Sequence, residues 1–152
     1  MMGASHYGPF EYTPSTRRPN FSWPNNGKIA LLIIPNVECF ALNTQLPAGE
    51  GNIPDVSAWG IRDYGNRIGV FRMIDAMVNY GVPGTVALNS DCCDVYPDVV
   101  EACLKHGWEL MGHCESNTHR LSSEKTEDDA HNLIRRTLDR IESFSGVRPR
   151  GW

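Results

Sequence analysis

The 152-residue sequence lacks the features that would place it in several specialised classes. It contains no apolar run near the roughly 20 residues that a bilayer span requires. Its first residues show neither the basic start nor the apolar segment of a signal peptide. The net charge of -4 also provides no basic surface for nucleic acid. These absences predict a cytoplasmic globular protein that binds neither a membrane nor nucleic acid.

Cysteine is present, but without the spacing that cross-links or metal sites use. The count is five, which is odd, and no two cysteines are separated by two residues. A disulfide framework normally needs an export signal, and a structural zinc site normally needs paired CxxC spacing. We therefore expect reduced thiols and no structural zinc.

Residues 1–27 lack any hydrophobic period. Prolines interrupt this segment repeatedly, and aromatic residues lie between them. Because proline fixes φ and removes a backbone donor, the segment is predicted to be an extended arm that packs on its own domain or on a neighbouring subunit. Residues 28–152 are predicted to form one domain.

That domain alternates short apolar runs with amphipathic stretches that end at glycine. The apolar runs predict parallel strands at 28–34, 84–89 and 108–111. The amphipathic stretches predict helices at 64–81, 96–106 and 126–144. This alternation is typical of an α/β fold with parallel strands and helical crossovers. Three strands do not close a barrel, so we expect the N-terminal half of a (β/α) barrel, continued by further residues or completed by a partner chain, as in a homo-oligomer.

Polar residues follow each expected strand at its carboxyl end, where α/β sheets bind ligands. They are Glu38 and Cys39 after the first strand, Asn89, Asp91 and Asp94 after the second, and His113, Glu115, Asn117 and His119 after the third. A carboxylate and a histidine at neighbouring strand ends can serve as general base and general acid. The pattern therefore predicts Glu38 and His113 as a catalytic pair.

Each of these residues also has a structural interpretation. Glu38 can form an ion pair with Arg62 or Arg67, and His113 can order its loop by bonding to backbone carbonyls. The two aspartates after the second strand suit the first turn of a helix, where acidic side chains complement the helix dipole.

Several segments together resemble the polysaccharide deacetylase, or NodB-like, superfamily. They are a first strand that ends in an acid, "GVPGTVALN", "HGWELMGH", "IRRTLDRIESFSG" and "RPRGW". Within the superfamily the likeness is to the branch of metal-independent allantoinases and related cyclic-amide hydrolases. The resemblance extends over residues 22–152 and implies a distorted (β/α) barrel of the NodB type, longer than this chain.

The resemblance also implies roles for the strand-end residues. Metal-dependent members carry two adjacent aspartates after the first strand, one a base and one a metal ligand, and two histidines spaced H-x-x-x-H after a later strand. Here Glu38 and Cys39 match the aspartates, and His113 and Asn117 match the histidines. Only His113 is retained among the three ligand positions, which implies an enzyme without a metal cofactor.

The implied activity is hydrolysis of a carbon–nitrogen bond other than a peptide bond, in a small amide, cyclic amide or ureide. Glu38 would activate water, and His113 would steady the oxyanion or protonate the leaving nitrogen. Arg150, within "RPRGW", would orient Glu38 or bind a carbonyl. The residues expected to contact substrate are Asn89, Glu115, Asn117 and His119.

Two alternatives remain open at this stage. A zinc-dependent deacetylase of N-acetylated sugars would use His113 and His119, with Glu115 or Cys39 completing the ligand set. A non-catalytic binding module would keep the fold without the metal site. The absence of an export signal disfavours an extracellular polysaccharide as substrate.

Overall fold

The computed structural model describes residues 11–46, 51–124 and 126–152, and these fall into two units, divided between Leu31 and Leu32. In the first unit, two short 3-10 turns, η1 (Ser15–Arg17) and η2 (Pro24–Asn26), interrupt an otherwise irregular chain. The rings of Phe21 and Trp23 meet edge to face there, with their centroids 5.0 Å apart. The irregular path follows from the prolines, which supply no backbone donor.

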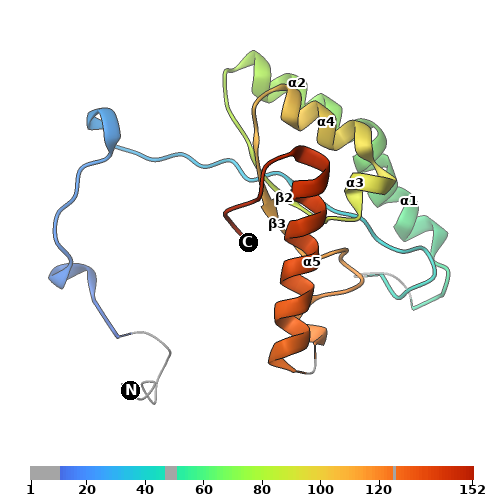
Figure 1. Ribbon diagram of the computed structural model, residues 1–152. Helices are drawn as coiled ribbons and strands as arrows, with labels where there is room; N and C mark the ends of the chain where they lie inside the picture. Colours follow the sequence, from blue (N-terminus) through green and yellow to red (C-terminus); the bar gives the residue numbers. More distant parts are fainter. Residues whose placement is uncertain (1–10, 47–50, 125) are drawn as a thin grey trace. The chain divides into compact units, whose positions relative to one another are not determined.

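The second unit contains a parallel sheet with the strand order β1-β2-β3 (Figure 1). The strands are β1 (Asn36–Val37), β2 (Thr85–Leu88) and β3 (Glu109–Gly112). In the register of the sheet, Val37 lies opposite Leu88, which in turn lies opposite Gly112. The predicted α/β class, with parallel strands joined by helical crossovers, is confirmed.

The first strand lies further along the chain than its apolar run predicted. The expected strand was 28–34, ending before Pro35. Hydrogen bonding to β2 instead begins where the Ile33 carbonyl accepts from the Thr85 N–H at 3.0 Å, and continues where the Pro35 carbonyl accepts from the Ala87 N–H at 2.9 Å. Pro35 does not end the strand, because only its carbonyl is used on this side and the missing N–H is not needed.

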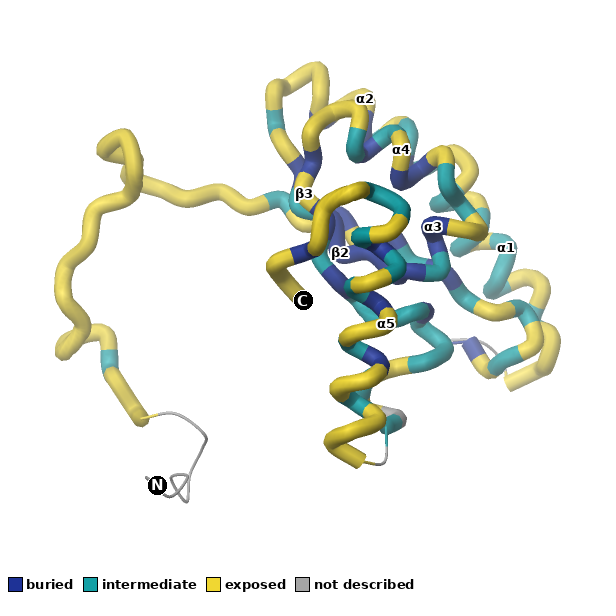
Figure 2. The backbone as a smooth tube through the Cα atoms, viewed as in Figure 1, coloured by how far each residue is buried: buried dark blue, intermediate teal, exposed yellow. Residues whose placement is uncertain are grey.

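The beginning of the same apolar run is exposed (Figure 2). Its exposed residues are Ile29 at 84%, Leu31 at 77% and Leu32 at 64%. Within the described ranges, β1 pairs only with β2, so it is an edge strand. Hydrophobic pattern alone could not distinguish an edge strand from a central one.

Helices connect and cover the strands. In chain order they are α1 (Val56–Tyr64), the π-helical turn η3 (Gly65–Gly69), α2 (Val70–Asn79), α3 (Cys92–Val95), α4 (Pro97–Lys105), the 3-10 turn η4 (Leu121–Ser123) and α5 (Glu127–Ser145). α2 packs against α4, while α5 packs against β3 and α3 (Figure 1). In the part of the chain that the structure describes, no helix has the length and apolar character of a membrane span.

The helices begin and end where local chemistry allows. The first helix was expected to start at residue 64, but α1 starts at Val56. The Asp55 side chain caps it by accepting a hydrogen bond from the Ala58 N–H at 2.9 Å. α5 starts as predicted, with Thr126 accepting from the Asp129 N–H at 3.1 Å. It ends at Gly146, whose φ of 75° lies in the left-handed region that glycine favours.

The core lies between the strands and the helices (Figure 2). Its most deeply buried side chains include Val37, Val86, Leu88, Val99, Val100, Cys103 and Ile141. Trp108 precedes β3 and is only 4% exposed. Its ring packs directly on Gly84, the residue that precedes β2, so the two strand starts are joined through one aromatic contact.

We expect Gly84→Ala to lower the free energy of unfolding by about 1–3 kcal/mol, the usual cost of overpacking. A Cβ at this position would lie 2.7 Å from Cε3 and 2.8 Å from Cδ2 of Trp108, and a buried ring has little room to move. Denaturant unfolding is the measurement. Gly60→Ala in α1 is the control, because a Cβ there meets nothing within 4 Å. It should raise stability by about 0.5–1 kcal/mol. Wild-type stability in Gly84→Ala would contradict the close packing.

Candidate active site

The three strand ends meet at one edge of the sheet. Because Val37, Leu88 and Gly112 are in register, the residues that follow them, Glu38, Asn89 and His113, are brought side by side. Backbone hydrogen bonds extend the pairing past the strands: the Asn89 N–H donates to the Val37 carbonyl at 3.0 Å, and the His113 N–H donates to the Leu88 carbonyl at 3.0 Å. The sheet itself therefore places the predicted pair next to each other.

The side chains of Glu38 and His113 are in contact. His113 Nε2 lies 3.2 Å from Glu38 Oε1, and the two side chains are 40% and 25% exposed. The Asn36 side chain approaches the same carboxylate oxygen, with its Nδ2 at 3.5 Å. This half-exposed carboxylate–imidazole pair can exchange protons with a bound molecule that reaches it from solvent.

Glu38 is also fixed through its backbone. The Asn66 side chain, in the π-helical turn η3, donates to the Glu38 carbonyl at 2.7 Å. Insertions of this kind in a helix are frequent at functional sites because they redirect a side chain. Arg67, proposed above as an ion-pair partner of Glu38, pairs instead with Asp63 at 2.5 Å.

Asp63 joins this helix to the segment between α3 and α4. Tyr96 donates its hydroxyl to Asp63 at 2.9 Å. Burial, together with this hydrogen bond, raises the pKa of Tyr96 to about 12, so its hydroxyl stays protonated and remains a donor. Asp63, Arg67 and Tyr96 are thus bonded to one another.

Cys39 turns away from the pair and into the core. It is 7% exposed, and its backbone N–H donates to the Asn89 side chain at 2.9 Å. Its thiol lies beside Cys92, where a hydrogen bond from Cys39 and burial strongly raise the pKa of the Cys92 thiol. The Cys92 thiol is therefore held in the protonated form, which is neither nucleophilic nor ready to bind a metal.

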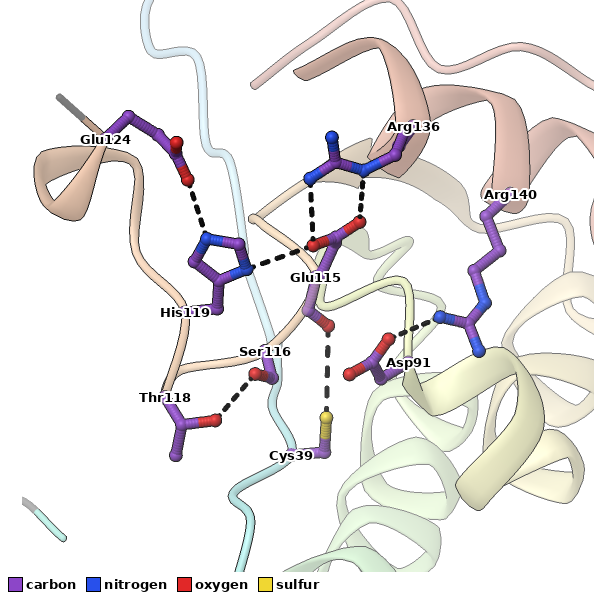
Figure 3. Close-up of polar contacts among 9 residues, drawn as sticks. All are labelled: Cys39, Asp91, Glu115, Ser116, Thr118, His119, Glu124, Arg136 and Arg140. Carbon is purple, nitrogen blue, oxygen red and sulfur yellow. Dashed lines mark hydrogen bonds and ion pairs between the residues drawn. The ribbon is translucent and has the colours of Figure 1, made fainter. Parts of the chain in front are cut away.

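Glu115 and His119, expected to contact substrate, are bonded to each other, and Glu115 is also bonded to α5 (Figure 3). Glu115 accepts from Arg136 Nε at 2.9 Å and from Arg136 Nη2 at 3.4 Å. His119 lies between two carboxylates, with Nδ1 3.1 Å from Glu115 and Nε2 2.6 Å from Glu124. The hydrogen bond from Arg136 is the main reason that the pKa of Glu115 lies below its ordinary value.

A second arginine of α5 binds the loop after β2. Arg140 forms ion pairs with Asp91 and with Asp94, and Figure 3 shows the contact with Asp91. Asp91 precedes α3 and Asp94 lies in its first turn, so the prediction that they lie at a helix start is confirmed. Burial raises the pKa of Asp91, and the opposing charge of Arg140 offsets part of that rise. Arg136 and Arg140, one helical turn apart, were overlooked in the sequence, although their spacing was visible.

Arg150 and His113 line different cavities. Arg150 is exposed and lines a cavity of about 250 Å³ together with Trp108 and Glu109, at the start of β3, whereas His113 follows the end of that strand. The next residue, Gly151, accepts a hydrogen bond from the Gly112 N–H at 3.0 Å, so this segment runs beside β3 as an incipient fourth strand. The catalytic role of Arg150 stays a prediction.

A cavity of about 380 Å³ opens beside His113. Its lining includes Asn117 and Arg120 from the same loop and Trp152 from the segment beside β3. Arg120 donates from Nε to the Asn117 carbonyl at 3.2 Å, which holds the guanidinium against the loop. Arg120 and Trp152 were not predicted from the sequence as site residues. Trp152 is far from this loop in the sequence, and only the fold brings it there.

The residues at the positions of the family's metal ligands do not fit a metal ion. Within residues 11–46, 51–124 and 126–152, no three histidine, cysteine, aspartate or glutamate side chains are grouped as a ligand set. Cys39 is directed into the core, and the Asn117 side-chain oxygen accepts from Asn89 at 3.2 Å. His119 is held between two carboxylates beside Arg136, so it is not placed to bind a metal ion together with His113.

Comparison with known proteins identifies the sequence pattern and the fold. The family model described as polysaccharide deacetylase matches residues 61–152. A comparison with curated proteins finds no match.

Solved structures match at low identity. A protein from Pseudomonas aeruginosa PAO1, titled a probable polysaccharide deacetylase, has a TM-score of 0.73 and 23% identity over 86% of this chain and 48% of its own. Puue allantoinase has a TM-score of 0.72 and 21% identity over 86% of this chain and 47% of its own. The chain therefore spans about half the length of the structures it resembles, and the expected fold, part of a NodB-type barrel, is confirmed.

We expect Glu115→Gln to have a lower melting temperature than wild type at about pH 7. The difference in melting temperature between the two proteins should shrink as the pH falls below the ordinary glutamate pKa of about 4.3. A carboxylate whose pKa is lower in the folded state stabilises the fold above its unfolded pKa. It loses that contribution as the pH falls through the folded value. Thermal unfolding followed by circular dichroism across this range is the measurement.

The control for this experiment is the same pair of proteins in an Arg136→Met background. Removing the guanidinium removes the main cause of the lowered pKa of Glu115, so the pH dependence should weaken. A difference between wild type and Glu115→Gln that stays constant with pH would show that the Glu115 charge does not stabilise the fold.

Proposed function

The chain belongs to the polysaccharide deacetylase family, and we propose that it supplies the base and acid of a hydrolase acting on a carbon–nitrogen bond other than a peptide bond. The proposed substrate is a small amide, cyclic amide or ureide. The observation that carries this proposal is the 3.2 Å contact between Glu38 and His113 at the carboxyl edge of the sheet.

Glu38 is the proposed base. It takes a proton from a bound water, and the water oxygen attacks the carbonyl carbon of the amide. The carbon–oxygen bond forms as the carbonyl electron pair moves onto its oxygen, giving a tetrahedral oxyanion. A positioned carboxylate typically contributes about 10²- to 10⁴-fold to such a step.

His113 is the proposed acid. Its imidazole, oriented by the carboxylate of Glu38, donates a proton to the departing nitrogen when the tetrahedral species collapses. The carbon–nitrogen bond breaks, the oxyanion returns its electron pair to the carbonyl, and the products are a carboxylate and an amine. The proton that Glu38 received can pass to His113 across their contact, which restores the pair for another cycle.

The cavity beside His113 is the proposed substrate site. Its volume of about 380 Å³ suits a small molecule. Asn117 and Arg120 supply N–H groups to this space, and hydrogen-bond donors are what a developing oxyanion requires. Trp152 offers a flat apolar surface on which a planar amide or ring can lie.

Because the described part of the chain contains no fitting ligand set, we favour chemistry without a metal over the zinc-dependent alternative. That alternative needs His113 and His119 to converge on one ion, and His119 is bonded to Glu115 and Glu124 instead. A non-catalytic binding module remains the other outcome. It would bind small amides in the cavity and show no turnover.

We expect Glu38→Gln to lower kcat by about 10²- to 10⁴-fold, because it keeps the side-chain shape and removes the base. His113→Asn should lower kcat more than it raises KM, since the histidine acts in the transition state. The measurement is turnover of a panel of cyclic amides and ureides. Glu101→Gln, an exposed position on α4, is the matched control and should behave as wild type.

Thermal unfolding separates catalysis from structure in these variants. If Glu38→Gln loses stability and activity together, Glu38 holds the loop and does no chemistry. Near wild-type turnover in Glu38→Gln would reject the mechanism. Binding of the panel without turnover in the wild-type protein would favour the binding module.

The purified protein should contain well under one equivalent of zinc, and chelators should leave its turnover intact. The reason is that neither Cys39 nor Asn117 presents a ligand beside His113. Elemental analysis after dialysis is the measurement. Stoichiometric zinc, together with loss of activity in chelator, would favour the zinc-dependent deacetylase.

A further inference from the structure

Asn89, the residue that follows β2, is fully buried and bonds to the segments on both sides of it. Its Oδ1 accepts from the backbone N–H of Cys39 at 2.9 Å. Its Nδ2 donates to the backbone carbonyl of His113 and, at 3.2 Å, to the side-chain oxygen of Asn117. One amide therefore joins the ends of all three strands.

These bonds fix the two residues of the proposed catalytic pair. Cys39 is the immediate neighbour of Glu38, so its N–H sets the path of the backbone just after the base. The His113 carbonyl belongs to the same residue as the imidazole. Because Asn89 follows the middle strand, its side chain reaches the backbone next to Glu38 on one side and the backbone of His113 on the other.

Asparagine is the side chain that this position requires. It must accept one hydrogen bond and donate two while wholly out of water, and a side-chain amide provides one carbonyl oxygen and two N–H groups. An ionised aspartate accepts only, and an aliphatic side chain does neither, so either change leaves buried backbone groups unpaired at a cost. Glutamine has the same groups but one more methylene, for which a fully buried site has no room.

We propose that Asn89 is a positioning residue that sets the separation and orientation of Glu38 and His113. The assignment rests on the proposed function. Asn89 acts through the pair and not on the substrate, since its side chain is 0% exposed and its amide is already engaged on three sides.

The loops keep other links when the Asn89 side chain is changed. The Ser90 N–H donates to the Cys114 carbonyl at 3.0 Å, and the Asn117 N–H donates to the Cys39 carbonyl at 3.1 Å. These bonds are between backbone groups and do not involve the Asn89 side chain. A variant at this position should therefore shift the pair locally and leave the sheet in place.

The first test compares Asn89→Asp with Ser90→Ala. Asn89→Asp keeps the shape and the acceptor but replaces the donor, so it should lower kcat by about 10²-fold, the effect expected of a misplacement near 1 Å. KM should change far less. Ser90 is an equally buried neighbour whose hydroxyl has no hydrogen-bond partner among the described residues, so Ser90→Ala should keep wild-type kcat.

A double variant tests whether Asn89 acts through the base. If it positions Glu38, then Asn89→Asp should cost little further activity once Glu38→Gln is present, because no base remains to be positioned. Losses in kcat that multiply in the double variant would show that Asn89 acts independently of Glu38 and would overturn the proposal.

Backbone amide hydrogen exchange tests the same role without a substrate. In Asn89→Ala, exchange of the Cys39 N–H should accelerate by roughly tenfold or more as its acceptor is removed. Exchange of the Ala87 N–H, which bonds to Pro35 within the sheet, should stay at the wild-type rate. Unchanged exchange at Cys39, or equal acceleration at both amides, would overturn the proposal. If this local pattern is seen but no amide is turned over, the proposed function fails while the coupling of the strand ends stands.

Discussion

The candidate active site depends on β2 being paired with a parallel strand on each side. Parallel pairing sends all three chains in the same direction, so their carboxyl ends meet at one edge. The register then decides which residues meet there. If one strand shifted its register by one residue, its side chains would point to the opposite face of the sheet. Glu38 and His113 would then be separated. Backbone hydrogen bonding in a buried sheet thus fixes the chemistry that this edge can perform.

The loops beyond the strands are held by a different interaction, ion pairing with α5. Arg136 binds Glu115 in the loop after β3, and Arg140 binds Asp91 in the loop after β2 (Figure 3). Because the two arginines lie one turn apart on one helix, they fix the two loops relative to each other. Glu115, which was expected to contact substrate, is used in this way to hold its loop, while Asn89 bonds to the ends of both outer strands.

The site combines a family fold with an unusual set of polar residues. In the match that the sequence resemblance implies, a carboxylate and an imidazole stand where metal-dependent members place a base and a ligand, and a buried thiol and an engaged amide occupy the neighbouring positions. The Cys39 thiol is buried, and an amide oxygen is a weaker ligand than imidazole. The hydrogen bonds of Cys39 and Asn117 to Asn89 tie these residues to the end of β2.

The sequence by itself determined the α/β class, the three parallel strands and the residues at their carboxyl ends. The helices and strands were predicted from the spacing of hydrophobic residues, from the positions of glycine and proline, and from the Thr126 cap. All of these are local properties of the chain, so local chemistry is enough to predict them. Only the tertiary structure decided that β1 begins after its apolar run and that Arg136 engages Glu115. It also decided that Arg150 lines a cavity with Trp108 and that Asn89 is buried. These outcomes depend on the order of the strands in the sheet and on contacts between side chains that are far apart in the sequence. A local sequence pattern contains no information about either.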